Sequence, residues 1–488
     1  MTQPRFSILV VDDRLNEVDK DTKLSRRESY NLLGDAFDVS FAESLLHFDQ
    51  LIVERRYDAF LVDFVLSEWG TTAALILARL KDRYPVGLIS SFWREKFEEL
   101  RQALDQHHAV KTLFCWDDLQ EEERRGLITS WMTRAIREHR GLSSFAVGPN
   151  ETLRLLHFSD LQFGGGEPKD FQSETYGMAE HIRTHWKGNG PSFILITGDI
   201  AEHGLPNQYN DAQNWIERFV KTVAPNWTKD RMMLIPGNHD ICRQLAMAAS
   251  IDPQTTSIGT SLNRELTQFA FAPFRQFAAR LTGDTNWHDP SSSYWVSGAF
   301  RHLGLIFFGY NTSETLDAKG GTTRLVQDTQ LAHMFDEVRR LKADAPAGCV
   351  VVGLVHHPLV PLKPEDALAD PTAFYRNMAV TPDFTWVMLT GHVHEGGVSP
   401  QDQVGVEFLE IISPTPTKQE STRPSDTLRG FNLIDVDRQN DIPIRLTITK
   451  FEFSGFTIVP RNKLVFERPE GQGPFRRPQR ANITDGAP

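Results

Sequence analysis

Short aliphatic runs that end abruptly in glycine and polar side chains recur along this chain, and they constrain its fold more than any other feature. Met232 to Pro236 leads into Gly-Asn-His-Asp at 237–240, and Trp386 to Leu389 leads toward Gly-His-Val-His at 391–394. Residues that follow strands fall on loops, and loops at one sheet edge can converge on a single site. Amide, imidazole and carboxylate groups together suit a pair of divalent metal ions that carry out hydrolysis.

The first part of the chain alternates apolar strands with amphipathic helices, which predicts a doubly wound parallel sheet in a domain spanning residues 1–140. A short stretch with glycine, serine and proline at 141–150 predicts a linker. The predicted strands of the first domain are Phe6–Val11, Phe37–Phe41, Ala59–Val62, Val86–Ile89 and Val110–Phe114.

A second alternation of strands and helices begins at Leu153 and predicts another α/β domain over 151–458. Its last part, Gly430 to Phe453, alternates polar and apolar residues as antiparallel strands do. Two packed sheets flanked by helices, a four-layer αββα arrangement, accommodate this number of strands. The rhythm is interrupted by an insertion at about 246–302. Residues 459–488 are rich in proline, glycine and arginine and predict a flexible tail.

Composition bounds the class of protein and its partners. The formal net charge of -12 argues against a long nucleic-acid track, which needs a basic face, and favours a small phosphoester substrate over duplex DNA. The only cysteines, Cys115, Cys242 and Cys349, lie far apart, so we expect a reducing cytoplasm. No signal peptide and no membrane-spanning run is evident in the sequence.

Five segments of the second domain place ligand-type residues after predicted strands. They are Ser-Asp-Leu-Gln at 159–162, Gly-Asp at 198–199, Gly-Asn-His-Asp at 237–240, His-His-Pro at 356–358 and Gly-His-Val-His at 391–394. In this order they resemble the pattern D-x-H, G-D, G-N-H-[DE], H and G-H-x-H of the calcineurin-like metallophosphoesterase family. The resemblance covers roughly Leu153 to Phe453.

The resemblance implies a role for each position. Asp199 bridges two divalent metal ions, which are manganese, iron or zinc in this family. Asp160, Gln162 and His394 complete the first metal site; Asn238, His356 and His392 complete the second, and His356 rather than His357 aligns with the family ligand. His239 is placed to protonate the leaving oxygen, with Asp240 holding its ring.

One position departs from the family pattern. The first motif has glutamine at Gln162 where the family has histidine. An amide oxygen is a weaker and harder donor than an imidazole nitrogen. Three interpretations stay open: Gln162 binds metal directly, binds it through water, or leaves the first metal loosely held.

Carboxylates also follow strands in the first domain. Asp12 and Asp13 come directly after the first strand and Asp63 ends the third, an arrangement that predicts a magnesium site. The pattern resembles the receiver domain of two-component signalling over about Phe6 to Arg140. It implies that Asp12 and Asp13 hold magnesium and that Asp63 accepts a phosphoryl group. Ser90 or Ser91 is then the switch hydroxyl, and the implied partner is a histidine kinase or another signalling protein.

The receiver resemblance has a gap as well. Receivers carry a lysine at the end of the fifth strand, whereas here Lys111 lies early in that strand and the expected position holds Cys115 or Trp116. The segment Leu15 to Leu33 is also longer and more charged than a simple loop and helix require. A receiver-like fold that serves only for docking or dimerisation therefore remains the alternative.

Taken together, the patterns predict a cytoplasmic signalling enzyme in which a receiver-like domain regulates a dinuclear metal phosphoesterase. A phosphodiester of a nucleotide or cyclic nucleotide is the favoured substrate. A metal-dependent nuclease is the enzymatic alternative, because a few arginines of the insertion could contact nucleic acid locally. A binding or scaffold protein with a degenerate metal site is the alternative from another class, motivated by Gln162.

Overall fold

The computed structural model describes most of the chain. The described residues are 6–19, 22–55, 57–80, 84–91, 110–140, 145–165, 171–249, 270–283, 293–315, 323–343, 345–360, 368–381, 383–394, 396–403, 405–417, 429–454, 457–468, 471 and 473–478. The chain divides into two compact units, Met1–Ser144 and Phe145–Pro488. None of the helices in these ranges is both long and apolar enough to cross a lipid bilayer.

The N-terminal unit is a five-stranded parallel sheet with the strand order β2-β1-β3-β6-β7. Its central strands form because they are continuous aliphatic runs, which suit a sheet covered on both faces. The strands are β1 (Phe6–Val11), β2 (Phe37–Ala42), β3 (Ala59–Asp63), β6 (Val86–Ser90) and β7 (Val110–Cys115).

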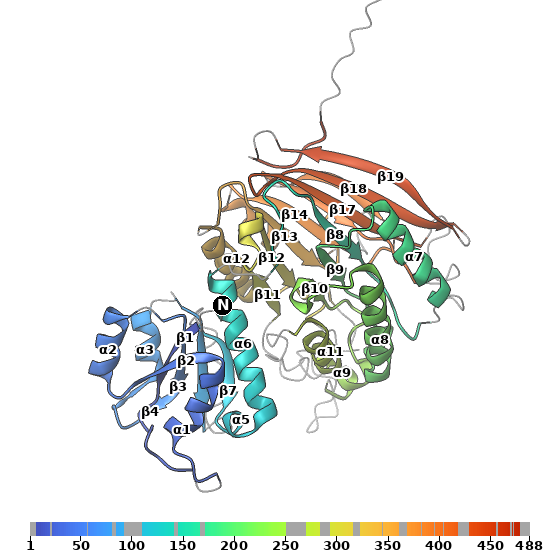
Figure 1. The fold of residues 1–488 in the computed structure, drawn as a ribbon. Coiled ribbons are helices and arrows are strands. Elements are labelled where there is room, and N and C mark those ends of the chain that lie inside the picture. The colour runs from blue at the N-terminus through green and yellow to red at the C-terminus, as the bar shows by residue number, and fades with distance from the viewer. Residues whose placement is uncertain are drawn as a thin grey trace, which may run out of the picture. The chain divides into compact units, whose positions relative to one another are not determined.

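Helices cover both faces of this sheet, as the sequence predicts for a doubly wound fold (Figure 1). One face packs against α2 (Leu45–Glu54) and α3 (Ala73–Leu80), and the other against α1 (Arg26–Asn31) and α6 (Glu122–Arg140). The remaining elements are η1 (Leu32–Asp35), α5 (Asp117–Gln120) and the hairpin of β4 (Val65–Leu66) and β5 (Thr71–Thr72). The sequence also predicts an amphipathic helix over 96–106, a stretch that lies outside the described residues.

The C-terminal unit is a sandwich of two six-stranded sheets. The first has the order β10 (Met232–Ile235), β9 (Phe193–Thr197), β8 (Leu153–Phe158), β17 (Gly430–Gln439), β18 (Ile442–Ser454) and β19 (Thr457–Glu467). The second has the order β11 (Tyr294–Ser297), β12 (Leu305–Tyr310), β13 (Val350–Val355), β14 (Thr385–Thr390), β16 (Val406–Ile412) and β15 (Gly397–Gln403).

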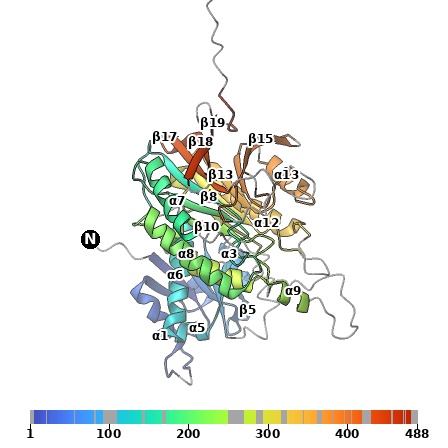
Figure 2. The same ribbon diagram turned by 90° about the vertical axis from the view of Figure 1, so that its right-hand side faces the viewer.

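Three apolar cores hold the C-terminal layers together. One lies between the two sheets, and one lies on the outer face of each sheet. Figure 2 shows α7 and α8 on one flank and α12 and α13 on the other. The helices are α7 (Phe171–His185), α8 (Pro206–Val223), α9 (Arg243–Ala249), α11 (Ala272–Thr282), α12 (Asp328–Ala343) and α13 (Thr372–Ala379), with short η2 (Lys229–Arg231) and η4 (Arg301–Leu303).

Helix α8 illustrates how the sequence specifies these layers. Pro206 begins the helix, where the missing N–H of proline costs nothing. Its buried residues recur every three or four positions from Gln208 to Val223, so one stripe faces the sheet. The phenylalanines of the predicted insertion pack the same way, because Phe274 and Phe277 of α11 are fully buried in the core under α8.

The predicted tail needs a correction. Residues 459–467 belong to β19, which pairs antiparallel with β18 from Arg445↔Glu467 to Ser454↔Thr457. The alternation of buried and exposed side chains in β19 is weak, and Pro460 sits at an edge strand, where proline is tolerated. The composition of residues 459–488 therefore does not indicate β19, which forms one edge of the first sheet.

Candidate metal centre

The five predicted motifs follow strands β8, β9, β10, β13 and β14, which belong to the two facing sheets. Backbone hydrogen bonds tie the first two loops together. The amide of Asp160 donates to the Gly198 carbonyl at 2.9 Å, and the amide of Gln162 donates to the Asp199 carbonyl at 2.8 Å. The amide of His392 donates to the Asp160 carboxylate at 3.1 Å. Side chains far apart in the sequence are thereby brought to one place.

Several residues of these loops adopt the left-handed backbone conformation, with positive φ. Of the ten non-glycine residues with positive φ in the described ranges, five are predicted metal ligands: Asp160, Gln162, Asp199, His392 and His394. A left-handed conformation costs a residue of this kind about 1–3 kcal/mol, and it persists where surrounding contacts fix it. Strain of this kind clusters at active sites and ligand-binding loops, so it points to the same residues as the motifs do.

Glycines let the loops approach one another. A Cβ on Gly391 would lie 1.8 Å from the Ser159 hydroxyl oxygen, and a Cβ on Gly237 would lie 2.2 Å from an Asp199 carboxylate oxygen. Both distances are shorter than any real contact. The glycines of these two motifs therefore serve close packing of the ligand loops.

Two buried carboxylates, Asp160 and Asp199, lie at the centre. Asp160 Oδ1 lies 3.2 Å from His394 Nε2, and Asp199 Oδ2 lies 3.4 Å from His356 Nε2. Burial alone would raise the pKa of Asp199, but the imidazoles of His356 and His239 hold it well below its ordinary value. In the same way His394 and His356 lower the pKa of Asp160 against the effect of burial.

The ring of His356 is oriented by a carbonyl. Its Nδ1 lies 2.7 Å from the Thr197 carbonyl oxygen, which only accepts, so Nδ1 carries a proton. In the neutral ring Nε2 then presents a lone pair, yet it faces two more acceptors: Asn238 Oδ1 at 3.0 Å and Asp199 Oδ2. Although burial opposes it, the Asp199 carboxylate raises the pKa of His356 to about 9, so a proton on Nε2 satisfies these acceptors in the absence of metal. The same set of imidazole, amide and carboxylate donors fits a divalent metal ion.

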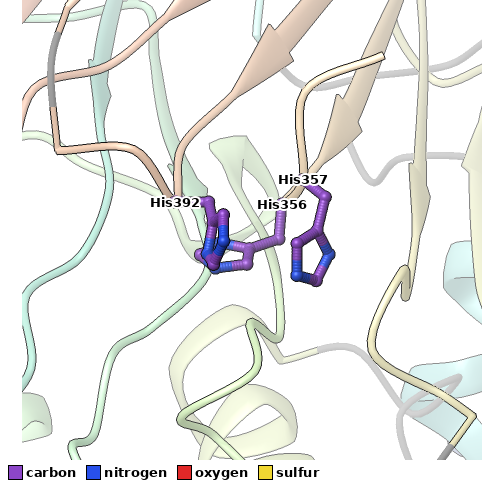
Figure 3. Close-up of side chains that lie close together, drawn as sticks. All are labelled: His356, His357 and His392. Carbon is purple, nitrogen blue, oxygen red and sulfur yellow. The ribbon is translucent and has the colours of Figure 1, made fainter. Parts of the chain in front are cut away.

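A second histidine lies beside this group. Figure 3 shows His356, His357 and His392 together, with ring centroids of His357 and His392 4.5 Å apart. Each of the three offers a nitrogen within 4.8 Å of the others. His357 Nδ1 is bonded to the Thr312 hydroxyl at 2.9 Å. Thr312, in the Asn-Thr-Ser segment at 311–313, thus holds His357 in place.

The side-chain amide of Gln162 is buried with its hydrogen-bonding groups unsatisfied. It is 3% exposed, and neither its amide oxygen nor its amide nitrogen has a hydrogen-bond partner among the described residues. Burying an amide without a partner costs about 1–3 kcal/mol. A buried amide without a protein partner fits a ligand that the protein itself does not contain.

The ring of His239 is held by Glu202, which corrects the predicted role of Asp240. His239 Nδ1 lies 3.0 Å from the Glu202 carbonyl oxygen and 3.4 Å from the Glu202 carboxylate. Nδ1 therefore donates to Glu202 and Nε2 is left for proton transfer. The backbone amide of His239 also donates to Asp199 at 2.8 Å, which couples the two residues.

Asp240 instead organises the backbone. Its fully buried carboxylate accepts hydrogen bonds from the amides of Ile200, Ala201 and Gly237 and from the Tyr209 hydroxyl, at 2.9–3.1 Å. Burial and the Asp199 carboxylate raise the pKa of Asp240 to about 6. No sequence motif indicates this role, because a carboxylate next to a catalytic histidine is commonly its hydrogen-bond partner.

Residues 153–396, half of the 488-residue chain, match the calcineurin-like phosphoesterase family. The chain belongs to this family. The match contains all the phosphoesterase motifs described above, and the facing donor atoms agree with a metal-dependent member.

Known proteins resemble the chain more distantly. An uncharacterized metallophosphoesterase-like protein, YydB, of Bacillus subtilis (strain 168) is 24% identical over 301 residues, which cover 59% of this chain and 57% of that protein. Among solved structures, PhoD has a TM-score of 0.42 with 13% identity, covering 70% of this chain and 74% of PhoD. A 5'-nucleotidase from Candida albicans SC5314 has a TM-score of 0.34 with 10% identity, covering 62% and 51%.

The carboxylates predicted in the N-terminal unit also converge. Asp12, Asp13 and Asp63 each offer an oxygen within 4.8 Å of the others, outside the carboxyl ends of β1 and β3. Sequence analysis missed a fourth member, because the guanidinium of Arg26 contacts both Asp12 and Asp63. The only sequence feature that pointed to Arg26 was the high content of charged residues in the 15–33 segment. Burial and the Asp12 charge raise the pKa of Asp63 to about 7, although Arg26 opposes this.

Proposed function

We propose that the C-terminal unit hydrolyses a phosphoester with the help of two divalent cations, and that a phosphodiester of a nucleotide or cyclic nucleotide is the substrate class. The observation that carries the proposal is the convergence of carboxylate, imidazole and amide groups from separate loops, in which His356 Nε2 lies 3.0 Å from Asn238 Oδ1 and 3.4 Å from Asp199 Oδ2. The net charge of -12 supports a small substrate over a long nucleic acid.

The proposed ligand sets are those that the family motifs imply, and the contacts Asp160–His394, Asp199–His356 and Asn238–His356 support them. Asp199 lies between the two groups and serves as the shared ligand; Asp160, Gln162 and His394 hold the first cation, and Asn238, His356 and His392 hold the second. Manganese, iron or zinc suits this mixture of oxygen and nitrogen donors. When bound, such ions supply a water of lowered pKa and neutralise phosphoryl oxygens.

His239 is the proposed proton donor to the leaving oxygen. Its Nδ1 is committed to Glu202, so the transferable proton is on Nε2. The Glu202 carboxylate pairs with the charged ring and orients it. Asp240 acts indirectly, because it fixes the amides of the 199–201 and 237–240 loops.

The test is metal-dependent turnover. We expect full-length protein stripped by a chelator to be inactive, and hydrolysis of a bis-aryl phosphate to return on adding Mn²⁺. A panel of nucleotides, cyclic nucleotides, single-stranded DNA and phosphopeptides then identifies the substrate class. Preferred turnover of single-stranded DNA would make the protein a nuclease, while turnover of phosphopeptides alone would contradict the nucleotide assignment.

A binding or scaffold protein with a degenerate metal site is the second candidate, and Gln162 is the observation that favours it. This candidate predicts that the purified protein contains less than one metal ion per chain and does not turn over any member of the panel. Metal analysis together with the assay therefore separates the two functions.

Replacing Gln162 with histidine should tighten metal binding at the first site roughly tenfold, because imidazole is the better donor for these ions. Histidine also tolerates the positive φ of this position (46°) better than glutamine does. Competition with a chromophoric chelator measures the change, and Gln162→Leu, which lacks a donor, should weaken binding. Equal metal affinity in all three proteins would mean that this side chain is not a ligand.

We infer that the N-terminal unit regulates the phosphoesterase and does not add a second catalytic activity. The inference is supported by its doubly wound sheet, in which ligands bind outside the carboxyl ends of the strands at the point where the strand order reverses. That point lies between β1 and β3, where the carboxylates and Arg26 meet.

A further inference from the structure

Asp12, Asp13 and Asp63 form an acidic pocket in the N-terminal unit, and the side chain of Arg26 places a positive charge in it. Arg26 is the first residue of α1 and is 5% exposed. One of its nitrogens, Nη1, lies 3.0 Å from Asp12 Oδ2 and 2.9 Å from Asp63 Oδ2, so it bridges the two carboxylates. The other, Nη2, donates to the Ser91 hydroxyl at 3.0 Å. A single guanidinium thus contacts three of the residues predicted for magnesium binding and switching.

Further contacts hold Arg26 in this position. Its guanidinium carbon lies 4.4 Å from the ring centroid of Trp116, the residue that directly follows β7. A capping box between Ser25 and Glu28 fixes the first turn of α1. The Tyr30 hydroxyl, one turn further along α1, donates to the same Asp12 oxygen at 2.9 Å. Arg26 is therefore built into the fold and is not a surface side chain in chance contact.

These contacts do not fit a magnesium ion in the same place. Magnesium binds oxygens at about 2.0–2.1 Å in octahedral geometry. The two oxygens that face each other across the pocket, on Asp12 and Asp63, already share Arg26 Nη1. Arg14 adds a second positive charge 3.6 Å from Asp63. A divalent cation would have to expel the guanidinium and to approach an arginine pair.

We propose that Arg26 is the resident cation of this pocket, so that the N-terminal unit holds no magnesium there and Asp63 accepts no phosphoryl group while α1 is docked. The fixed charge that a receiver takes from a lysine after its fifth strand then comes from the first helix, with Trp116 as its stacking surface. Any signal passing through this unit must compete with Arg26 for Asp12 and Asp63.

The direct test is phosphorylation of the full-length wild-type protein. Incubation with phosphoramidate and Mg²⁺, followed by borohydride trapping and peptide mass spectrometry, should leave Asp63 unmodified. Stoichiometric modification of Asp63 would overturn the proposal. This measurement needs no variant, so it decides the matter even if Arg26 variants fold poorly.

A second test asks whether Arg26 takes the place of a cation. Arg26→Ala leaves buried carboxylates uncompensated and should lower the melting temperature of the N-terminal unit by roughly 10 °C. Added Mg²⁺ should recover part of this loss. The recovery should vanish in Arg26→Ala/Asp13→Asn, which retains any magnesium effect on the C-terminal unit. The matched control on the same helix is Arg27→Ala, which removes an exposed pair with Glu43 and a contact with the Phe41 ring.

An equal response to Mg²⁺ in wild type, Arg26→Ala and the double variant would show that Arg26 does not occupy a cation position. A response of the wild type that Asp13→Asn abolishes would show that magnesium binds despite Arg26. Either result contradicts the proposal. Both tests concern the N-terminal unit alone and are independent of phosphoesterase turnover.

Discussion

Asp199→Ala should lower the rate of phosphodiester hydrolysis by at least about 10³-fold, while the circular dichroism spectrum stays that of the wild type. Loss of a shared metal ligand removes several kcal/mol of charge stabilisation, which corresponds to a rate factor of this size. The fold should tolerate the change because the lost charge lies near two other buried carboxylates, Asp160 and Asp240. Steady-state kinetics in saturating Mn²⁺ measure the loss.

The matched control for this variant is Asp211→Ala, which removes an exposed carboxylate on α8. It should retain wild-type kinetics. Metal analysis of Asp199→Ala should also show fewer than two ions per chain. A wild-type rate in this variant would refute the shared-ligand role and, with it, the proposed dinuclear site.

His239→Gln should reduce hydrolysis in a manner that depends on the leaving group. For an ester with an alkyl alcohol as leaving group, the rate should fall about 10²–10⁴-fold, because proton donation to the departing oxygen is lost. For a nitrophenyl ester the fall should be much smaller, since nitrophenolate departs without a proton. The ratio of the two values of kcat/KM is the measurement.

The exposed neighbour His203 provides the control, because His203→Gln leaves the imidazole at 239 and its Glu202 contacts in place. It should leave the ratio unchanged. An equal loss on both esters in His239→Gln would show that the imidazole does not transfer a proton to the leaving oxygen, because the variant keeps the backbone amide that donates to Asp199.

Much of the fold was predictable from the sequence, because apolar residues recur at different spacings in buried strands and in amphipathic helices. The strands at 59–63 and 193–197 are fully buried, as the apolar runs at 59–62 and 193–196 predict. The edge strand β19 was not readable, since its side chains face solvent along much of its length. Pairing with β18, which forms only in the folded chain, decides its structure.

The site was predictable to the extent that its residues sit in short motifs after strands. The motifs do not specify which residues from other loops contact each of these side chains. Glu202 supports His239 through a carbonyl and a carboxylate from a different loop, and no spacing in the sequence announces this. The role of Arg26 was not predictable for the same reason, because its hydrogen bond to Asp63 joins residues 37 positions apart in the sequence.

The pairing of β8 with β17 bears on how the protein is made. Leu153 pairs with Val436, and the hydroxyls of Thr415 and Thr417 bond the Asp160 carbonyl at 2.7 and 3.1 Å. A nascent chain leaving the ribosome therefore carries the Asp160 loop while it grows to Thr415, which lies 255 positions after Asp160. We expect activity to appear only late in translation, so ribosome-stalled fragments that end before β17 should be inert.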